Sequence, residues 1–155
     1  MNSTDFSVCV LTLEKRPDCQ HISIYVEFHY KLYCTLEYHG KSLDIKMHSF
    51  GGNSPQVAST YNNMATVYSD KGDTAKAMEL YQRSLAIQLD TLGESHPDVA
   101  ASYNNIANLY SKRQVKDKAF DYYNKALAIR VQIYEETHPD VADTYFNLGL
   151  DHETI

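Results

Sequence analysis

The fold of this chain is decided by a five-residue motif that occurs three times, as Ser54-Pro55-Gln56-Val57-Ala58, His96-Pro97-Asp98-Val99-Ala100 and His138-Pro139-Asp140-Val141-Ala142. The spacing is 42 residues from Pro55 to Pro97 and again from Pro97 to Pro139. A constant period of this size is typical of stacked supersecondary units, in which each unit contacts only its neighbours. Such stacks present long grooves to other proteins, so the repeat predicts a binding module.

Each copy of the repeat predicts two helices. Ser54 suits a helix cap and Pro55 suits the first helical position, so the first helix of the first copy is expected over about 55–70. Gly72 supplies a left-handed residue that ends this helix, and Asp73 or Thr74 caps the second. Apolar residues recur at helical spacing in the first helix, at Val57, Tyr61, Met64, Ala65 and Tyr68. The second helix has them at Ala77, Leu80, Tyr81, Leu85 and Leu89, matched one copy later by Ala119, Tyr122, Tyr123, Leu127 and Val131.

Two places depart from this pattern of helix endings. Gln114 stands where the first copy has Gly72, and Tyr134-Glu135 stands where the earlier linkers have Leu92-Gly93 and Phe50-Gly51. A non-glycine that takes the left-handed conformation costs about 1 kcal/mol. Both helix ends are therefore expected to be weak points of the array.

The repeat can be followed upstream of the first motif. Residues 42–47 align with 84–89, so a helix over about 35–50 is expected as the second helix of an earlier, eroded copy. Before it, apolar and polar residues alternate from Ile22 to Tyr33, which suits a half-buried strand. A run from Val8 to Leu13 could pair with that strand as a hairpin, and a degenerate or poorly ordered segment fits equally well.

The expected organisation is therefore an uncertain segment at 1–34 followed by a repeat array at 35–155. The array divides into a half repeat at 35–53, full repeats at 54–95 and 96–137, and a truncated repeat at 138–155.

Charge and composition narrow the range of partners. The net charge of −6 and the isoelectric point near 5.6 argue against nucleic acid or an anionic membrane as the main partner. No run of 18 or more apolar residues occurs, and the first residues lack the basic and apolar regions of a secretion signal, so a cytoplasmic protein is expected.

Catalytic and metal sites are not indicated. His96 and His138 occupy equivalent linker positions, but neither has a second ligand three or four residues away, so capping or solvent exposure is the better interpretation. The acidic residues Glu135, Glu136 and Asp140 lack a nucleophile or an orienting partner. We therefore expect no enzyme activity, no cofactor and no metal.

The repeat pattern resembles the tetratricopeptide repeat (TPR), in the 42-residue form of the kinesin light chains. The resemblance rests on the His-Pro-Asp-Val-Ala opening, on residues 103–110 (Tyr-Asn-Asn-Ile-Ala-Asn-Leu-Tyr) and on residues 125–130 (Lys-Ala-Leu-Ala-Ile-Arg), and it covers about 35–155. It implies an all-α fold, a right-handed α-solenoid of antiparallel helix pairs. The N-terminal segment, with the strand pattern described above, precedes this array. No heptad pattern precedes residue 54, so attachment to a motor chain is not supported.

The resemblance also implies a site. In this family the first helix of each repeat lines a concave groove, and an asparagine on it contacts extended peptides. The matching residues are Asn63, Asn105 and Asn147, with Asn62, Asn104 and Asn108 as neighbours. A carboxamide both donates and accepts, so it can hold a peptide backbone whatever the side chains. The alternative is that each asparagine bonds to the neighbouring repeat and fixes the stacking.

Two functions remain open from the sequence. The first is a non-catalytic protein interaction module that binds a peptide or a helix of a partner protein in the concave groove. The second is a fragment of a larger scaffold, such as a kinesin light chain-like adaptor or a signalling protein, that forms homo-oligomers through exposed half repeats.

Overall fold

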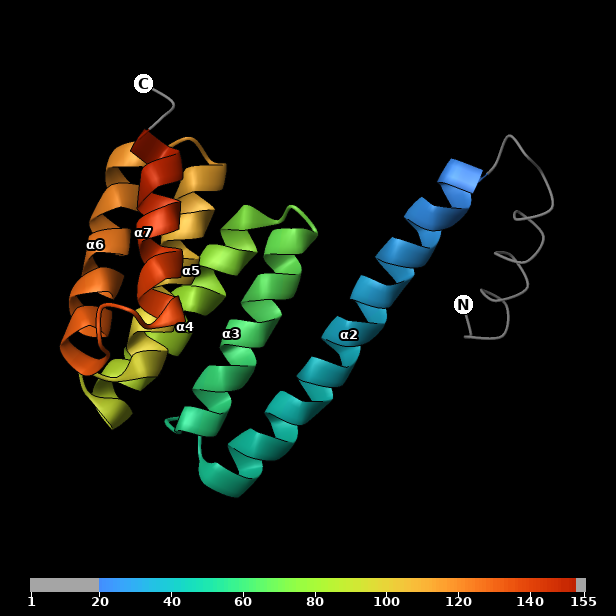
Figure 1. The fold of residues 1–155 in the computed structure, drawn as a ribbon. Coiled ribbons are helices and arrows are strands. Elements are labelled where there is room, and N and C mark those ends of the chain that lie inside the picture. Colours follow the sequence, from blue (N-terminus) through green and yellow to red (C-terminus); the bar gives the residue numbers. More distant parts are fainter. Residues whose placement is uncertain (1–19, 153–155) are drawn as a thin grey trace.

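The computed structural model describes residues 20–152, with side chains from 27 to 149. This range is folded into six helices and has no strand (Figure 1). In chain order the helices are α2 (Gln20–Phe50), α3 (Pro55–Asp70), α4 (Thr74–Leu92), α5 (Pro97–Lys112), α6 (Lys116–Ile133) and α7 (Pro139–His152).

The three proline motifs start helices, as the sequence predicts. Ser54 caps α3, because its side chain accepts a hydrogen bond from the backbone N–H of Val57 at 3.4 Å. At the starts of α5 and α7 a histidine side chain caps the helix in the same way. Nδ1 of His96 accepts from the N–H of Asp98 at 3.1 Å, and Nδ1 of His138 accepts from the N–H of Asp140 at 3.2 Å. The prediction that these histidines cap helices is confirmed.

The helix ends differ from one another. Gly72 has a φ of 85°, and Gln114 takes the same left-handed conformation with a φ of 59°, so the expected strain at this residue is present. Tyr134 instead leaves α6 in an extended conformation, with a φ of −112°. Its ring stacks on that of His138, with 3.9 Å between the centroids. The third linker therefore changes direction without the left-handed residue that the sequence pattern led us to expect.

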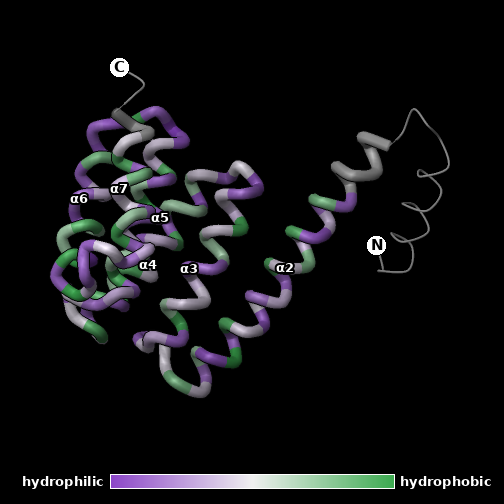
Figure 2. Tube along the Cα trace, in the orientation of Figure 1, coloured by the Kyte–Doolittle hydropathy of each residue, from purple (hydrophilic) through white to green (hydrophobic). Residues whose placement is uncertain are grey.

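Consecutive helices form antiparallel pairs around small residues. Ala65 of α3 and Ala77 of α4 are fully buried in one cluster with Leu80 and Tyr81, and Ala107 and Ala119 repeat this arrangement between α5 and α6. Alanine lets the two backbones approach closely, while the larger side chains fill the space beside them. Hydrophobic and hydrophilic residues are interspersed along every helix in Figure 2. Within residues 20–152 no helix is long and apolar enough to cross a membrane.

Helix α2 corrects the strand expected from the alternating pattern. Residues 22–33 lie within this 31-residue helix, which continues through residue 34 without a break. The alternation misleads because a run with period two also places Phe28, Leu32 and Leu36 four residues apart, which is a helical spacing. Extending an existing helix is also much easier than nucleating a new element. The proposed partner strand, Val8 to Leu13, lies outside the described residues.

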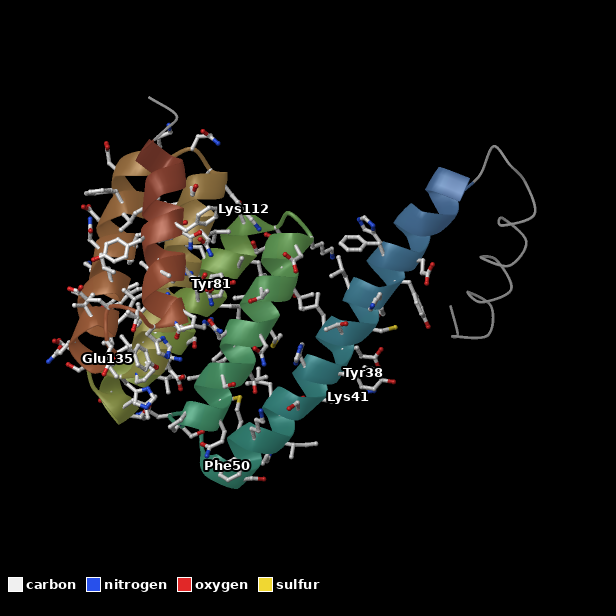
Figure 3. All side chains as sticks on the ribbon, viewed as in Figure 1. Tyr38, Lys41, Phe50, Tyr81, Lys112 and Glu135 are labelled. Atoms are coloured by element: carbon white, nitrogen blue, oxygen red, sulfur yellow. The ribbon has the colours of Figure 1, made fainter. Side chains whose placement is uncertain are left out.

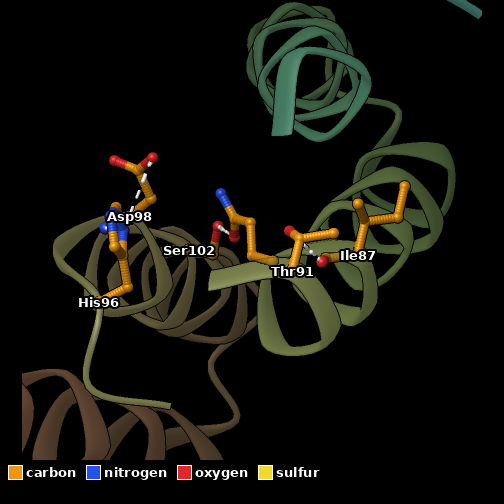
Figure 4. Close-up of polar contacts among 6 residues, drawn as sticks. Ile87, Thr91, His96, Asp98 and Ser102 are labelled. Atoms are coloured by element: carbon orange, nitrogen blue, oxygen red, sulfur yellow. Dashed lines mark hydrogen bonds and ion pairs between the residues drawn. The ribbon is translucent and has the colours of Figure 1, made fainter. Parts of the chain in front are cut away.

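A polar link, buried at two of the three junctions, joins each second helix to the first helix of the next repeat. Nζ of Lys46 donates to the Thr60 hydroxyl at 2.8 Å, the Ser102 hydroxyl donates to Oε1 of Gln88 at 2.6 Å, and Nη1 of Arg130 donates to the Thr144 hydroxyl at 2.6 Å. In each case the partners are 14 residues apart. Figure 4 shows the central link at Ser102. The C-terminal half of α2 therefore contacts α3 as α4 contacts α5.

Candidate functional site

A polar groove of about 350 Å³ runs across the first helices of the repeats. Helices α3, α5 and α7 supply most of its lining, and α4 and α6 each add one tyrosine. The lining residues are mainly hydroxyls and carboxamides: Thr66, Ser69, Asp70, Tyr81, Asn105, Asn108, Ser111, Lys112, Tyr123 and Asn147. The groove lies on the first helices, which are the helices on which the sequence analysis places the candidate binding residues.

The predicted asparagines form a ladder from repeat to repeat. Nδ2 of Asn105 donates to Oδ1 of Asn62 at 3.2 Å, and Nδ2 of Asn147 donates to Oδ1 of Asn104 at 3.4 Å. The two bonds are one repeat apart and join successive first helices. The structure therefore contains the hydrogen bonds between repeats that the stacking alternative expects. These bonds do not exclude a role of the same residues in binding.

The six predicted residues divide into two groups. Asn105, Asn108 and Asn147 line the groove. Asn62 and Asn104 act as the ladder's acceptors and do not line it, and Asn63 is exposed on α3 outside the lining.

Two tyrosines of the second helices support the groove wall. The hydroxyl of Tyr123 donates to Oδ1 of Asn108 at 2.5 Å, and the hydroxyls of Tyr81 and Thr66 share a hydrogen bond at 3.0 Å. These two pairs are equivalent in the repeat. The sequence analysis placed these tyrosines among the apolar positions of the second helices and did not consider Thr66. Comparing residues 66 with 108 and 81 with 123 at the 42-residue period is the signal that would have found them.

The groove is close to neutral although the chain is acidic. Among the described residues that line it, only Asp70 and Lys112 carry charged side chains, and Nζ of Lys112 donates to the Ser69 hydroxyl at 3.0 Å. Lys112 is labelled in Figure 3. Burial raises the pKa of Tyr81 above its ordinary value, and the charge of Asp70 raises it further, against the hydrogen bond from Thr66. Tyr81 therefore presents a neutral hydroxyl at neutral pH.

The side chains that line the groove offer hydrogen-bond donors and acceptors. Across the part of the chain with described side chains, no group of three His, Cys, Asp or Glu residues could hold a metal ion.

Comparison with known proteins agrees with this architecture. The model of the tetratricopeptide repeat family matches residues 35–90, 79–130 and 98–155. No curated protein sequence matches the chain.

Solved structures with a similar fold include BtubC (BKLC) from P. vanneervenii, with a TM-score of 0.73 and 23% identity over 96% of this chain and 63% of that protein. A candidate kinesin light chain of Podosopora anserina with nearly identical TPR-like repeats has a TM-score of 0.71 and 21% identity, over 81% of this chain and 59% of that protein. The chain thus spans less than two thirds of either protein. The expected all-α solenoid with kinesin light chain-like repeats is confirmed, and the chain belongs to the tetratricopeptide repeat family.

Proposed function

We propose that the concave groove binds an extended segment of a partner protein. The observation that carries the proposal is the groove across α3, α5 and α7, whose lining residues are mainly hydroxyl- and carboxamide-bearing, with the carboxamides of Asn105, Asn108 and Asn147 in its wall. Repeat proteins of this kind generally act as interaction scaffolds through such concave surfaces.

The asparagine ladder favours this function because it leaves bonding capacity free. A carboxamide has two N–H donors and an oxygen that accepts two hydrogen bonds. The ladder uses one donor of Asn105 and one of Asn147, so the oxygen of each remains available to a ligand backbone. The ladder also fixes the rotamers of these side chains before binding, which lowers the entropy cost of holding a ligand.

The charges of the groove indicate which ligands fit. Asp70 and Lys112 offer one charge of each sign. A strongly acidic segment is therefore repelled by Asp70, and a strongly basic segment is repelled by Lys112. We therefore propose that the ligand is held mainly through its backbone and through uncharged side chains.

The test is selection of peptides from a displayed random library on the purified chain, followed by calorimetric titration of the selected peptides. Asn105→Ala and Asn147→Ala should each weaken binding by about tenfold, since each removes a hydrogen-bonding group worth about 1.4 kcal/mol. Asn124→Ala on the exposed side of α6 is the matched control and should bind as the wild type does. Selected peptides that bind all variants equally, or the absence of any selected peptide, would contradict the proposal.

Self-association is a second candidate function. It is favoured by two exposed aromatic side chains on the first and last described helices, Tyr38 of α2 (70% exposed) and Tyr145 of α7 (53% exposed). Aromatic residues are enriched at protein–protein interfaces.

A further inference from the structure

Helix α2 exposes a residue whose equivalent is buried in α4 and half-buried in α6. Tyr38 lies one period before Leu80 of α4 and two periods before Tyr122 of α6. Leu80 is 5% exposed, in a cluster with Ala65 of α3 and Ile106 of α5, whereas Tyr38 is 70% exposed. Within the described residues no first helix covers this face of α2.

Helix α7 exposes the complementary face of a first helix. Tyr145 corresponds to the half-buried Tyr61 and Tyr103 but is 53% exposed. Gly149 corresponds to Ala65 and Ala107, whose side chains are fully buried against the following helix. A Cβ added at Gly149 would meet no atom within 4 Å, so this face of α7 is open.

A cluster of two tyrosines and a lysine shows how such faces fit together. In the second full repeat, the rings of Tyr103 on α5 and Tyr122 on α6 lie 5.9 Å apart. Nζ of Lys125, also on α6, lies 5.0 Å from the centre of the Tyr122 ring and 5.8 Å from that of Tyr103. The cation attracts both aromatic rings, so the trio ties a first helix to its second helix.

Two members of this trio are already arranged on α2. Lys41 corresponds to Lys125 and Tyr38 to Tyr122, and Nζ of Lys41 lies 5.6 Å from the centre of the Tyr38 ring. Both side chains point away from α3 in Figure 3. The missing third member is a tyrosine on a first helix, and α7 carries one at the equivalent position, Tyr145.

We propose that α7 of one copy packs antiparallel on α2 of a second copy and completes a repeat between them. This inference deepens the self-association candidate and is independent of peptide binding in the groove. Tyr145 meets Tyr38 and Lys41 as Tyr103 meets Tyr122 and Lys125. Gly149 faces Thr35, as Ala107 faces Ala119, so the backbones can approach closely.

The contact joins two different surfaces, so it is heterologous. Each copy that docks its α7 still offers its own α2, and the assembly grows head to tail without closing. Because each chain carries a net charge of −6, copies repel one another and association should strengthen with added salt.

The test is the molar mass of the full chain by light scattering over a range of concentrations, for the wild type and for Tyr38→Arg and Tyr145→Arg. The wild-type mass should rise steadily above 17.7 kDa, and each variant alone should stay at that mass at concentrations where the wild type associates. An equimolar mixture of the two variants retains one intact α7 and one intact α2. It should therefore form a heterodimer of twice the monomer mass and grow no further.

The controls separate this contact from other causes. Ala86→Arg adds the same charge on the exposed side of α4 and should associate as the wild type does, and Tyr38→Phe keeps the ring and should also associate. Helical circular dichroism checks that each variant is folded. A monomeric wild type, an effect of Tyr38→Arg without one of Tyr145→Arg, or a mixture that stays monomeric would each overturn the proposal. Peptide binding by the monomeric variants reports on the groove separately.

Discussion

Ser102 on α5 donates a 2.6 Å hydrogen bond to Oε1 of Gln88 on α4, and the two side chains are only 1% and 5% exposed. Two polar groups are thus withdrawn from water between repeats and satisfy each other. Burying such a pair costs little folding free energy while both partners are present. If one partner is removed, the other becomes an unsatisfied buried polar group.

This link gives the first prediction. Ser102→Ala should lower the free energy of unfolding by about 1–3 kcal/mol, because the Gln88 oxygen loses its donor while it remains buried. The double variant Gln88→Leu with Ser102→Ala should recover part of that loss, because both polar groups are gone. Urea denaturation followed by circular dichroism measures the effect, with the exposed Ser59→Ala as control. Two single losses that simply add in the double variant would count against a coupled pair.

Two glycines should respond to alanine in opposite directions. A Cβ added at Gly40 or at Gly72 would meet no atom within 4 Å. Steric clash therefore cannot account for a difference between the two alanine variants. Gly40 lies inside α2, and Gly40→Ala should stabilise the chain by about 0.5–1 kcal/mol. Gly72 has a φ of 85°, so Gly72→Ala should destabilise it by about 1 kcal/mol. The change in thermal unfolding midpoint gives the sign, and a shift in the same direction for both variants would disprove the conformational explanation.

The histidine cap of α5 should tolerate serine but not alanine. The first motif already uses Ser54 at this position, so His96→Ser keeps an acceptor for the N–H of Asp98. His96→Ala removes the acceptor and should lower the free energy of unfolding by about 1 kcal/mol. Chemical denaturation of the two variants side by side makes the comparison, and equal stability of both would show that the side-chain cap contributes nothing.

Stability should fall in alkaline solution. Burial raises the pKa of Tyr81, Tyr103 and Tyr122 above the ordinary value of 10.0. In the unfolded chain these phenols ionise first, so their contribution is complete below about pH 10 and is lost as the pH rises through the folded-state values. Urea midpoints at about pH 8 and about pH 11 measure the loss. Tyr81→Phe should reduce it and the exposed Tyr33→Phe should not; equal losses in both variants would assign the effect to other groups.

The sequence predicted the helix starts and ends correctly where they depend on residues within one repeat. The helix starts at Pro55, Pro97 and Pro139 follow from local capping chemistry, and so does the left-handed conformation at Gln114. The extended Tyr134 could not be inferred in this way, because its conformation is accompanied by stacking on His138 across the linker.

Contacts between repeats were much harder to predict. The sequence predicted six asparagines as candidate groove residues, and three of them line the groove. Only the relative placement of α3, α5 and α7 shows which of them bond to the next first helix. The strand expected over 22–33 was wrong because its pattern is compatible with both periods, and the neighbouring helix decides between them. The polar links between repeats went unnoticed because Lys46, Gln88 and Arg130 differ in chemistry, although they occupy equivalent positions.

Those links also bear on how an array of this kind can change in length. Thr60, Ser102 and Thr144 each meet a different partner type, and a hydroxyl can donate as well as accept. If one 42-residue unit were duplicated or deleted, any of the three partners would face a hydroxyl and the new junction would have a complete bond. The number of repeats can therefore vary without a compensating substitution at the junctions.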